Sequence, residues 1–81
     1  MSEPTITAWA AKAHNEHRRD VGEFSLFVEP AGADWRWSVE WGDDTIAEGT
    51  EPLRDSEAEE VSRAKAACED AARKAGIAVP S

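Results

Sequence analysis

Few side chains in this sequence have the type and spacing that metal binding needs. His14, Glu16 and His17 resemble part of a metal site. A zinc ion takes three or four protein ligands, and the best further ligand, Cys68, is expected on the buried side of a helix. We therefore interpret the cluster as a solvated polar connection, and we expect neither a metal ion nor another cofactor.

Calcium binding and hydrolytic catalysis are not indicated either. Asp34, Asp43 and Asp44 supply oxygen atoms, but no loop presents alternating acids closed by a bidentate Glu. The sequence has no glycine-rich phosphate loop, no G-x-S-x-G and no distinctive spacing of Ser, His and Asp. Cys68 is expected to be a small buried hydrophobe. We therefore expect a protein that is not an enzyme.

The negative charge of the chain points to protein partners. The 81 residues include 17 acids and 9 Lys and Arg, which gives a net charge of -8 at pH 7. Residues 23–60 hold twelve of the acids and two of the bases. Phosphate binding is driven by Lys and Arg, so direct nucleic-acid binding and a polybasic contact with membranes are disfavoured. Basic proteins are the expected partners.

Length and cysteine content limit the class further. A chain of this size is expected to build a single domain over residues 1–81, with one modest core. One cysteine allows no internal disulfide, which favours a reducing compartment. The sequence shows neither the pattern of a signal peptide nor an apolar stretch of roughly 20 residues. The expectation is a cytoplasmic protein without membrane contact.

Residues 5–51 are predicted to be rich in strands. Trp35, Trp37, Val39 and Trp41 alternate with polar residues, as in a half-buried strand. Residues 24–29 alternate too, and residues 30–34 have the Pro and Gly of a reversing turn, so the two runs predict an antiparallel hairpin. Residues 45–50 can return as a further strand, with either Ile46 or its small neighbours facing inward. For residues 5–14 we prefer a strand, although a helix also fits.

A helix is predicted over residues 56–75. Ser56 and Glu59 have the spacing of a capping box, and Gly76 is typical of the position after a helix. One apolar stripe of small residues recurs at steps of three and four: Ala58, Val61, Ala64, Cys68, Ala71 and Ala75. Small residues fit a close approach to a sheet that bears large Trp side chains. The predicted fold is α+β: a three- to four-stranded antiparallel sheet, one C-terminal helix across one face, and a short tail over residues 77–81.

Carboxylates on the predicted strands and turns form the candidate binding surface. They can create a continuous negative field on the sheet face away from the helix and along the turns. Phe27 lies on this polar face, where it is either an interface anchor or is covered by another strand or the N-terminal segment. The candidate binding residues are Phe27, Glu29, Asp34, Glu40, Asp43, Asp44, Glu48 and Glu51. A surface that only keeps the protein soluble would show the same acids.

The sequence pattern also resembles a group of phage proteins. The run Trp35-x-Trp37-x-Val39, the return over residues 47–50 and the Ala-rich capped helix with Lys74-Ala75-Gly76 at its end look like small sheet-plus-helix proteins of phages and prophages. Some of these are anti-CRISPR proteins that act on multi-subunit type I effector complexes. The resemblance spans residues 23–76, lies in pattern and size, and transfers no site residue. It implies a stoichiometric inhibitor that binds the effector's basic DNA-recognition surface and excludes target DNA. Inhibitors of this kind act as DNA mimics, by dimerising or by blocking a nuclease, and the sequence does not choose among these modes.

Two functions from different classes therefore remain open. The first is a phage-encoded inhibitor, monomeric or homodimeric, that binds a basic nucleic-acid-handling protein complex and blocks its DNA binding. The alternative is a structural or assembly protein that forms homo-oligomers through a sheet edge or its N-terminal segment.

Overall fold

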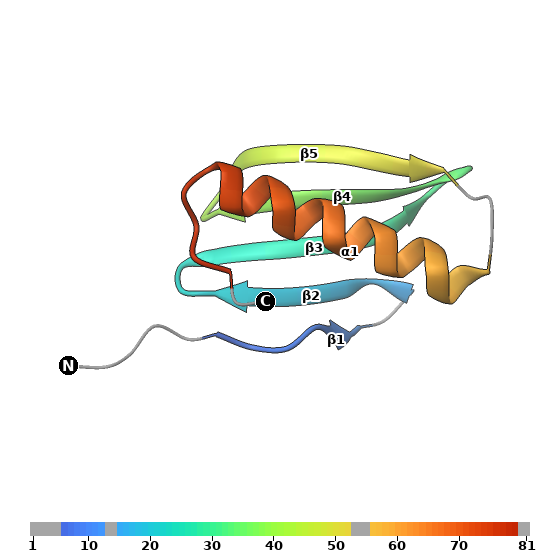
Figure 1. The fold of residues 1–81 in the computed structure, drawn as a ribbon, viewed down its shortest axis with the longest axis horizontal. Coiled ribbons are helices and arrows are strands. Elements are labelled where there is room, and N and C mark those ends of the chain that lie inside the picture. Colours follow the sequence, from blue (N-terminus) through green and yellow to red (C-terminus); the bar gives the residue numbers. More distant parts are fainter. Residues whose placement is uncertain (1–5, 13–14, 53–55, 80–81) are drawn as a thin grey trace.

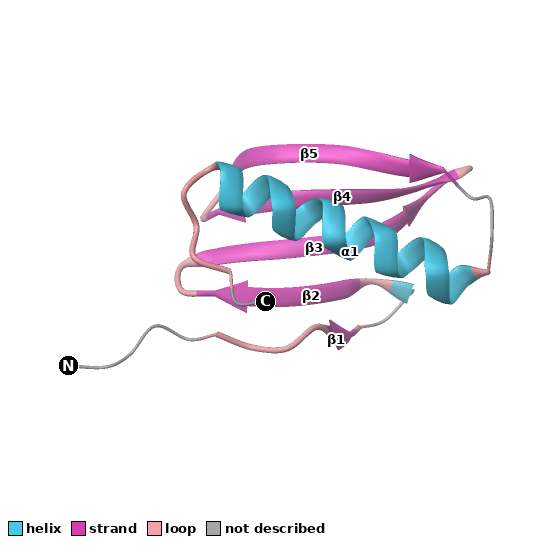
Figure 2. Cartoon of the chain, in the orientation of Figure 1, coloured by secondary structure: helices cyan, strands magenta, loops and turns pink. Residues whose placement is uncertain are grey.

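One helix lies across one face of a five-stranded antiparallel sheet. The computed structural model describes residues 6–12, 15–52 and 56–79. Its elements, in chain order, are β1 (Ala10–Ala11), β2 (His17–Val21), β3 (Phe24–Ala31), β4 (Asp34–Trp41), β5 (Asp44–Pro52) and α1 (Glu57–Lys74). The strands are neighbours in the same order, and α1 runs diagonally over them (Figures 1 and 2). The α+β class with one C-terminal helix is confirmed, whereas the predicted three to four strands are too few.

The additional strand is β2, which the sequence suggested was a solvated connection. Its pairing with β3 runs from His17 opposite Val28 to Val21 opposite Phe24. The sequence of β2 is HRRDV, so only its last residue shows the apolar character expected of a strand. The strand fits the sheet nevertheless, because long arginine stems can lie on apolar surface while their charged ends find partners.

The segment before β2 is a strand only in part. Ala10–Ala11 pairs with β2, and Ile6 forms an isolated bridge to Val21. Between them Trp9 packs against the core and donates its Nε1–H to Glu69 of α1 at 3.0 Å. The predicted strand over residues 5–14 is thus reduced to short pairings, and Thr5 and residues 13–14 lie outside the described residues.

The hairpin predicted from the alternating pattern is present. Pairing of β3 with β4 extends from Phe24 opposite Trp41 to Ala31 opposite Asp34, so the turn is shorter than the predicted 30–34. It is built on Gly32, whose φ of 66° falls where other residues are strained. In β5 Ala47 packs against the core and Gly49 lies opposite Trp37, whereas Ile46 is 41% exposed. Thr45, the third small residue, pairs with Glu40 beyond a bulge and is exposed.

The core lies between the middle of the sheet and α1. Leu26, Val28 and Val39 are fully buried, and burial of each such side chain stabilises the fold by about 1.5–3 kcal/mol. The helix contributes Val61, Ala64, Cys68 and Ala72 to the core. Two members of the predicted stripe, Ala58 and Ala75, are exposed, and Ala71 is only half-buried. The buried stripe instead continues in steps of four from Ala64 to Ala72, which keeps it on one side of the helix.

The Trp residues of β4 differ in environment although they share a strand face. Trp35 is buried and donates its Nε1–H to the carboxylate of Glu60 at 3.3 Å. Trp37 lies over Gly49 of β5, its partner in the sheet register. Trp41, expected to meet the helix, is 49% exposed. The large side chains of β4 are therefore packed in the first part of the strand and exposed at its end.

Both ends of the helix follow their sequence signals. The Oγ of Ser56 accepts the backbone N–H of Glu59 at 3.4 Å, so the predicted N-terminal cap is confirmed. After α1, Gly76 has a φ of 90°, and Ile77 and Val79 fold back into the core. The predicted tail is thus docked as far as Val79; residues 80–81 are not described. No helix in the described part of the chain is long and apolar enough to cross a membrane.

We predict that Gly49→Ala lowers the free energy of unfolding by about 1–3 kcal/mol, because the added Cβ would overlap the indole of Trp37. Thr50→Ser, at an exposed position of the same strand, should change it by less than about 0.5 kcal/mol. Urea unfolding of both variants measures the difference. Equal midpoints for Gly49→Ala and the parent chain would contradict the close contact.

We also predict that the thiol of Cys68 does not react in the folded protein. Cys68 is fully buried, its Sγ lies 3.3 Å from the backbone carbonyl of Ser38, and burial raises the pKa of the thiol to about 12. Iodoacetamide at pH 8 should modify Cys68 only after unfolding. An added thiol at exposed Ala66 (Ala66→Cys) should react at once and serves as the internal control. Rapid modification of Cys68 in the native chain would overturn this placement.

Candidate functional site

The face of the sheet opposite α1 is the candidate binding surface. In the β3–β4 register Phe27 lies opposite Ser38, Glu29 opposite Arg36, and Ser25 opposite Glu40. These positions alternate with the buried Leu26, Val28 and Val39, so they lie on the side away from the helix. We call this surface the open face. Its residues are Glu16, Arg18, Asp20, Ser25, Phe27, Glu29, Arg36, Ser38, Glu40 and Glu48.

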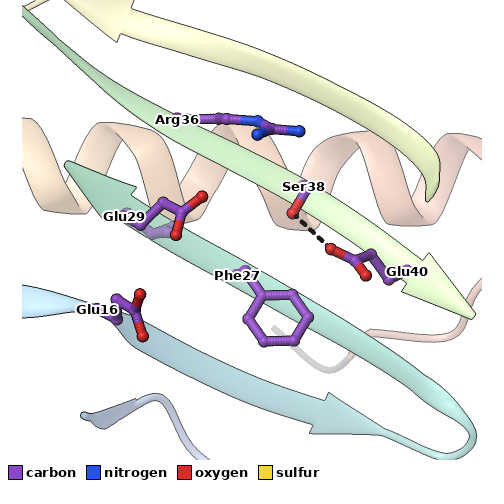
Figure 3. A pocket seen from close by; sticks show the side chains of 7 residues that line it. Glu16, Phe27, Glu29, Arg36, Ser38 and Glu40 are labelled. Atoms are coloured by element: carbon purple, nitrogen blue, oxygen red, sulfur yellow. Dashed lines mark hydrogen bonds between the residues drawn. The ribbon is translucent and has the colours of Figure 1, made fainter. Parts of the chain in front are cut away.

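Phe27 is the aromatic centre of the open face. Its ring is half-buried, and the guanidinium carbon of Arg18, on the neighbouring strand β2, lies 5.3 Å from the ring centroid. A contact of this kind is worth about 0.5–1 kcal/mol at an exposed site. The ring also lines a hollow of about 230 Å³ together with Glu16, Glu29 and Glu40 (Figure 3). A neighbouring strand therefore covers Phe27 in part and leaves the rest of the ring accessible.

Two arginines neutralise part of the acidic charge of this face. Arg36 donates to Glu48 of β5 at 2.5 Å, and this hydrogen bond raises the pKa of Arg36. Arg18 donates to Asp20 at 3.0 Å and to the hydroxyl of Ser25 at 3.4 Å. Both ion pairs are largely exposed, so they fix side-chain positions more than they stabilise the fold.

The remaining described carboxylates of the open face form no close ion pair, although the charges of Glu29 and Glu40 help to raise the pKa of Arg36. Within the described residues Glu16, Glu29 and Glu40 form no ion pair at 4.0 Å or less. Glu40 accepts a hydrogen bond from Ser38, a buried hydroxyl, at 3.3 Å. Around Phe27 these three acids come from the segment just before β2, from β3 and from β4 (Figure 3). The open face thus combines an accessible aromatic ring with carboxylates that can accept donors from a partner.

The other predicted binding residues lie at the margin of the open face or away from it. Glu51 is opposite Trp35 in the register and so falls on the helix side of the sheet. Asp34 begins β4 on the same side of the strand as Arg36, at the margin of the open face. Asp43 and Asp44 lie beyond the other end of β4, about 24 Å away along an eight-residue strand. Of the eight candidates, the open face unites Phe27, Glu29, Glu40 and Glu48. The predicted acids therefore do not form one continuous field.

Sequence reasoning missed the contribution of β2 to this face. Arg18 and Asp20 point to the open face, while Arg19, between them, forms an ion pair with Glu69 of α1. A period of two is present in residues 16–21, with Glu16, Arg18 and Asp20 on one side and His17, Arg19 and Val21 on the other. Because only Val21 is apolar, that period is hidden from a hydrophobicity pattern.

The histidine cluster does not form a metal site in the part of the chain that is described. No group of three or more His, Cys, Asp or Glu side chains is placed there to hold a metal ion, and His14 lies outside the described residues. His17 packs near the ring of Trp35, with 6.4 Å between the ring centroids. Burial, and then the nearby charge of Lys65, lowers the pKa of His17, although Glu57 opposes the shift. His17 therefore belongs to the helix-side packing.

Comparison with known proteins adds no functional assignment to this geometry. Neither a protein-family model, nor a curated protein, nor a solved structure matches the chain. The chemistry of the open face therefore has to be inferred from its own residues.

Proposed function

We propose that the protein is a non-enzymatic binding module that docks its open face on a basic surface of a nucleic-acid-handling protein complex. The observation that carries this proposal is the set of three unpaired carboxylates, Glu16, Glu29 and Glu40, around the partly accessible ring of Phe27. An aromatic anchor surrounded by acceptors fits a protein surface rich in Arg and Lys.

The sheet makes this surface rigid. Side chains on one face recur about every 7 Å along a strand and about 4.8 Å across strands. Carboxylates held at such spacings present negative charge in a fixed array, as a nucleic-acid backbone does. A partner groove that binds phosphates would meet this array without much loss of conformational freedom on either side, and its charge would speed association at low salt.

The resemblance of the sequence to small phage proteins supports a narrower version. In that version the protein is a stoichiometric inhibitor in the host cytosol, of the anti-CRISPR kind. It would occupy the basic DNA-recognition surface of a type I effector complex and exclude target DNA. The open face supplies the acceptors, and the two paired arginines keep their neighbouring acids in place.

Self-assembly through a sheet edge is the less favoured alternative. Within the described chain β5 has β4 as its one neighbouring strand, so its outer edge is available for pairing. However, Asp44, Glu48 and Glu51 all lie on this nine-residue strand. Pairing with a second copy of β5 would bring like charges together, which costs free energy.

We predict that neutralising the open face weakens partner binding by about tenfold or more. The tagged chain is used to capture nuclease-treated nucleic-acid-binding complexes, and each captured complex is then purified. Its affinity for the parent chain and for the variant Glu29→Gln/Glu40→Gln is measured at low and at physiological salt. The parent chain should compete with DNA for the complex and should bind more weakly as salt increases.

The matched control is Glu59→Gln/Asp70→Asn, which removes the same charge from exposed positions of α1. This variant should bind within about twofold of the parent chain, since its charges lie on the other side of the molecule. Equal losses in the two variants would mean that only net charge matters. The proposal would be refuted if the affinity for the complex changed neither in the open-face variant nor with salt. It would also be refuted if the complex still bound DNA with the parent chain attached.

A further inference from the structure

A second surface with the character of a docking site lies at one end of the sheet. Three large hydrophobic side chains are exposed in the described chain: Ile6 and Trp41 at 49% and Ile46 at 41%. Ile6 is bridged to Val21, the last residue of β2, and Trp41 is the last residue of β4. Both ends lie at the side of the β2–β3 and β4–β5 turns (Figure 1).

One of these exposed side chains, Ile6, lines an apolar hollow. The hollow has a volume of about 350 Å³ and is lined by Ile6, Val21, Phe24 and Ile77, among others. Phe24 lies directly opposite Trp41 in the β3–β4 register. Residues that are directly opposite share a sheet face, with Cβ atoms about 4.5–5.5 Å apart. The exposed indole therefore continues the apolar surface of the hollow.

The rim of this surface is acidic. A neighbouring hollow of about 580 Å³ is lined by Glu23, Trp41, Asp43 and Asp44 together with Gly42. The indole Nε1–H of Trp41 donates to the carboxylate of Glu23 at 3.4 Å. None of the described residues that line the two hollows is a Lys or Arg. We call the surface formed by the two hollows the Trp41 end. Its residues are Ile6, Val21, Gly22, Glu23, Phe24, Trp41, Gly42, Asp43, Asp44, Gly76, Ile77 and Ala78.

We propose that the Trp41 end binds a protein segment that presents an aliphatic or aromatic side chain flanked by Lys or Arg. The apolar hollow accepts the central side chain, Trp41 covers it, and the three carboxylates pair with the flanking cations. A half-exposed tryptophan beside a hollow is the type of residue that dominates binding energies at interfaces. The charges of the rim select basic flanks over acidic ones.

This proposal goes beyond the function assigned to the open face and does not depend on it. The hollow around Phe27 shares no lining residue with the two hollows of the Trp41 end. A second copy of the chain is a poor occupant, because a two-fold contact would place Glu23, Asp43 and Asp44 of one copy against the same acids of the other. A basic segment from another protein meets no such repulsion.

The test uses the full ¹⁵N-labelled chain and two synthetic peptides. The first, the Lys peptide, has a central Leu with two Lys residues before it and two after it. The second, the Glu peptide, has Glu in place of each Lys. We expect the Lys peptide to cause saturable NMR shifts at the Trp41 indole and at the amides of Glu23, Phe24 and Ile77. The Trp41→Ala variant should bind it about 30-fold more weakly. The Glu peptide should cause no saturable shift.

Two control variants separate this surface from the rest of the molecule. Ile46→Ala removes a similarly exposed hydrophobic side chain from β5, and Glu29→Gln/Glu40→Gln changes the open face; both should bind the Lys peptide with unchanged affinity. The variant Asp43→Asn/Asp44→Asn removes two carboxylates of the rim, so it should lower the affinity for the Lys peptide. It keeps the apolar hollow and should not disturb the fold. The proposal is overturned by shifts centred on Phe27, by a Trp41-dependent dimer in light scattering, or by no saturation up to about 1 mM peptide.

Discussion

Close packing of a helix made of small residues against the middle of the sheet determines the rest of this structure. Ala64, Cys68 and Ala72 are fully buried, and without long side chains they let α1 approach β3 and β4 closely. Leu26 and Val39 are then completely enclosed. Most of the described large apolar side chains pack on that side, and a chain of 81 residues has few of them. The opposite face is consequently left to polar residues and Phe27.

Contacts on the helix side of the sheet fix the positions of residues on the open face. On the helix side, Glu69 of α1 accepts both the indole Nε1–H of Trp9 and the guanidinium of Arg19. These contacts hold β2 and the segment before it against the helix, although β2 has little apolar character of its own. Because β2 is held in place, Arg18 lies over Phe27 on the other face. The ion pair between Arg19 and Glu69 on the helix side thus helps to position Arg18 in the open face.

The elements that follow a hydrophobic period were predictable, and those that do not were missed. The helix and β3–β4 have strong periods, whereas β2 is held by Arg19 and backbone pairing, which no hydrophobicity pattern reports. The grouping of the acids was harder to predict. A bulge at Val39 and Glu40 shifts the β4–β5 register, and a shift of one residue exchanges the two faces of a strand. Which β5 acid lies beside Arg36 depends on this irregularity.

The central claim is that the open face, and not the helix side, contacts the partner. A photo-reactive phenylalanine analogue in place of Phe27 tests it most directly, with a second variant carrying the analogue in place of Ala66, an exposed position of α1. Each variant is irradiated with the purified partner complex, and the cross-links are located by mass spectrometry. The predicted result is cross-linking from position 27 to a basic surface of the partner and none from position 66. Cross-linking from position 66 alone would contradict the claim.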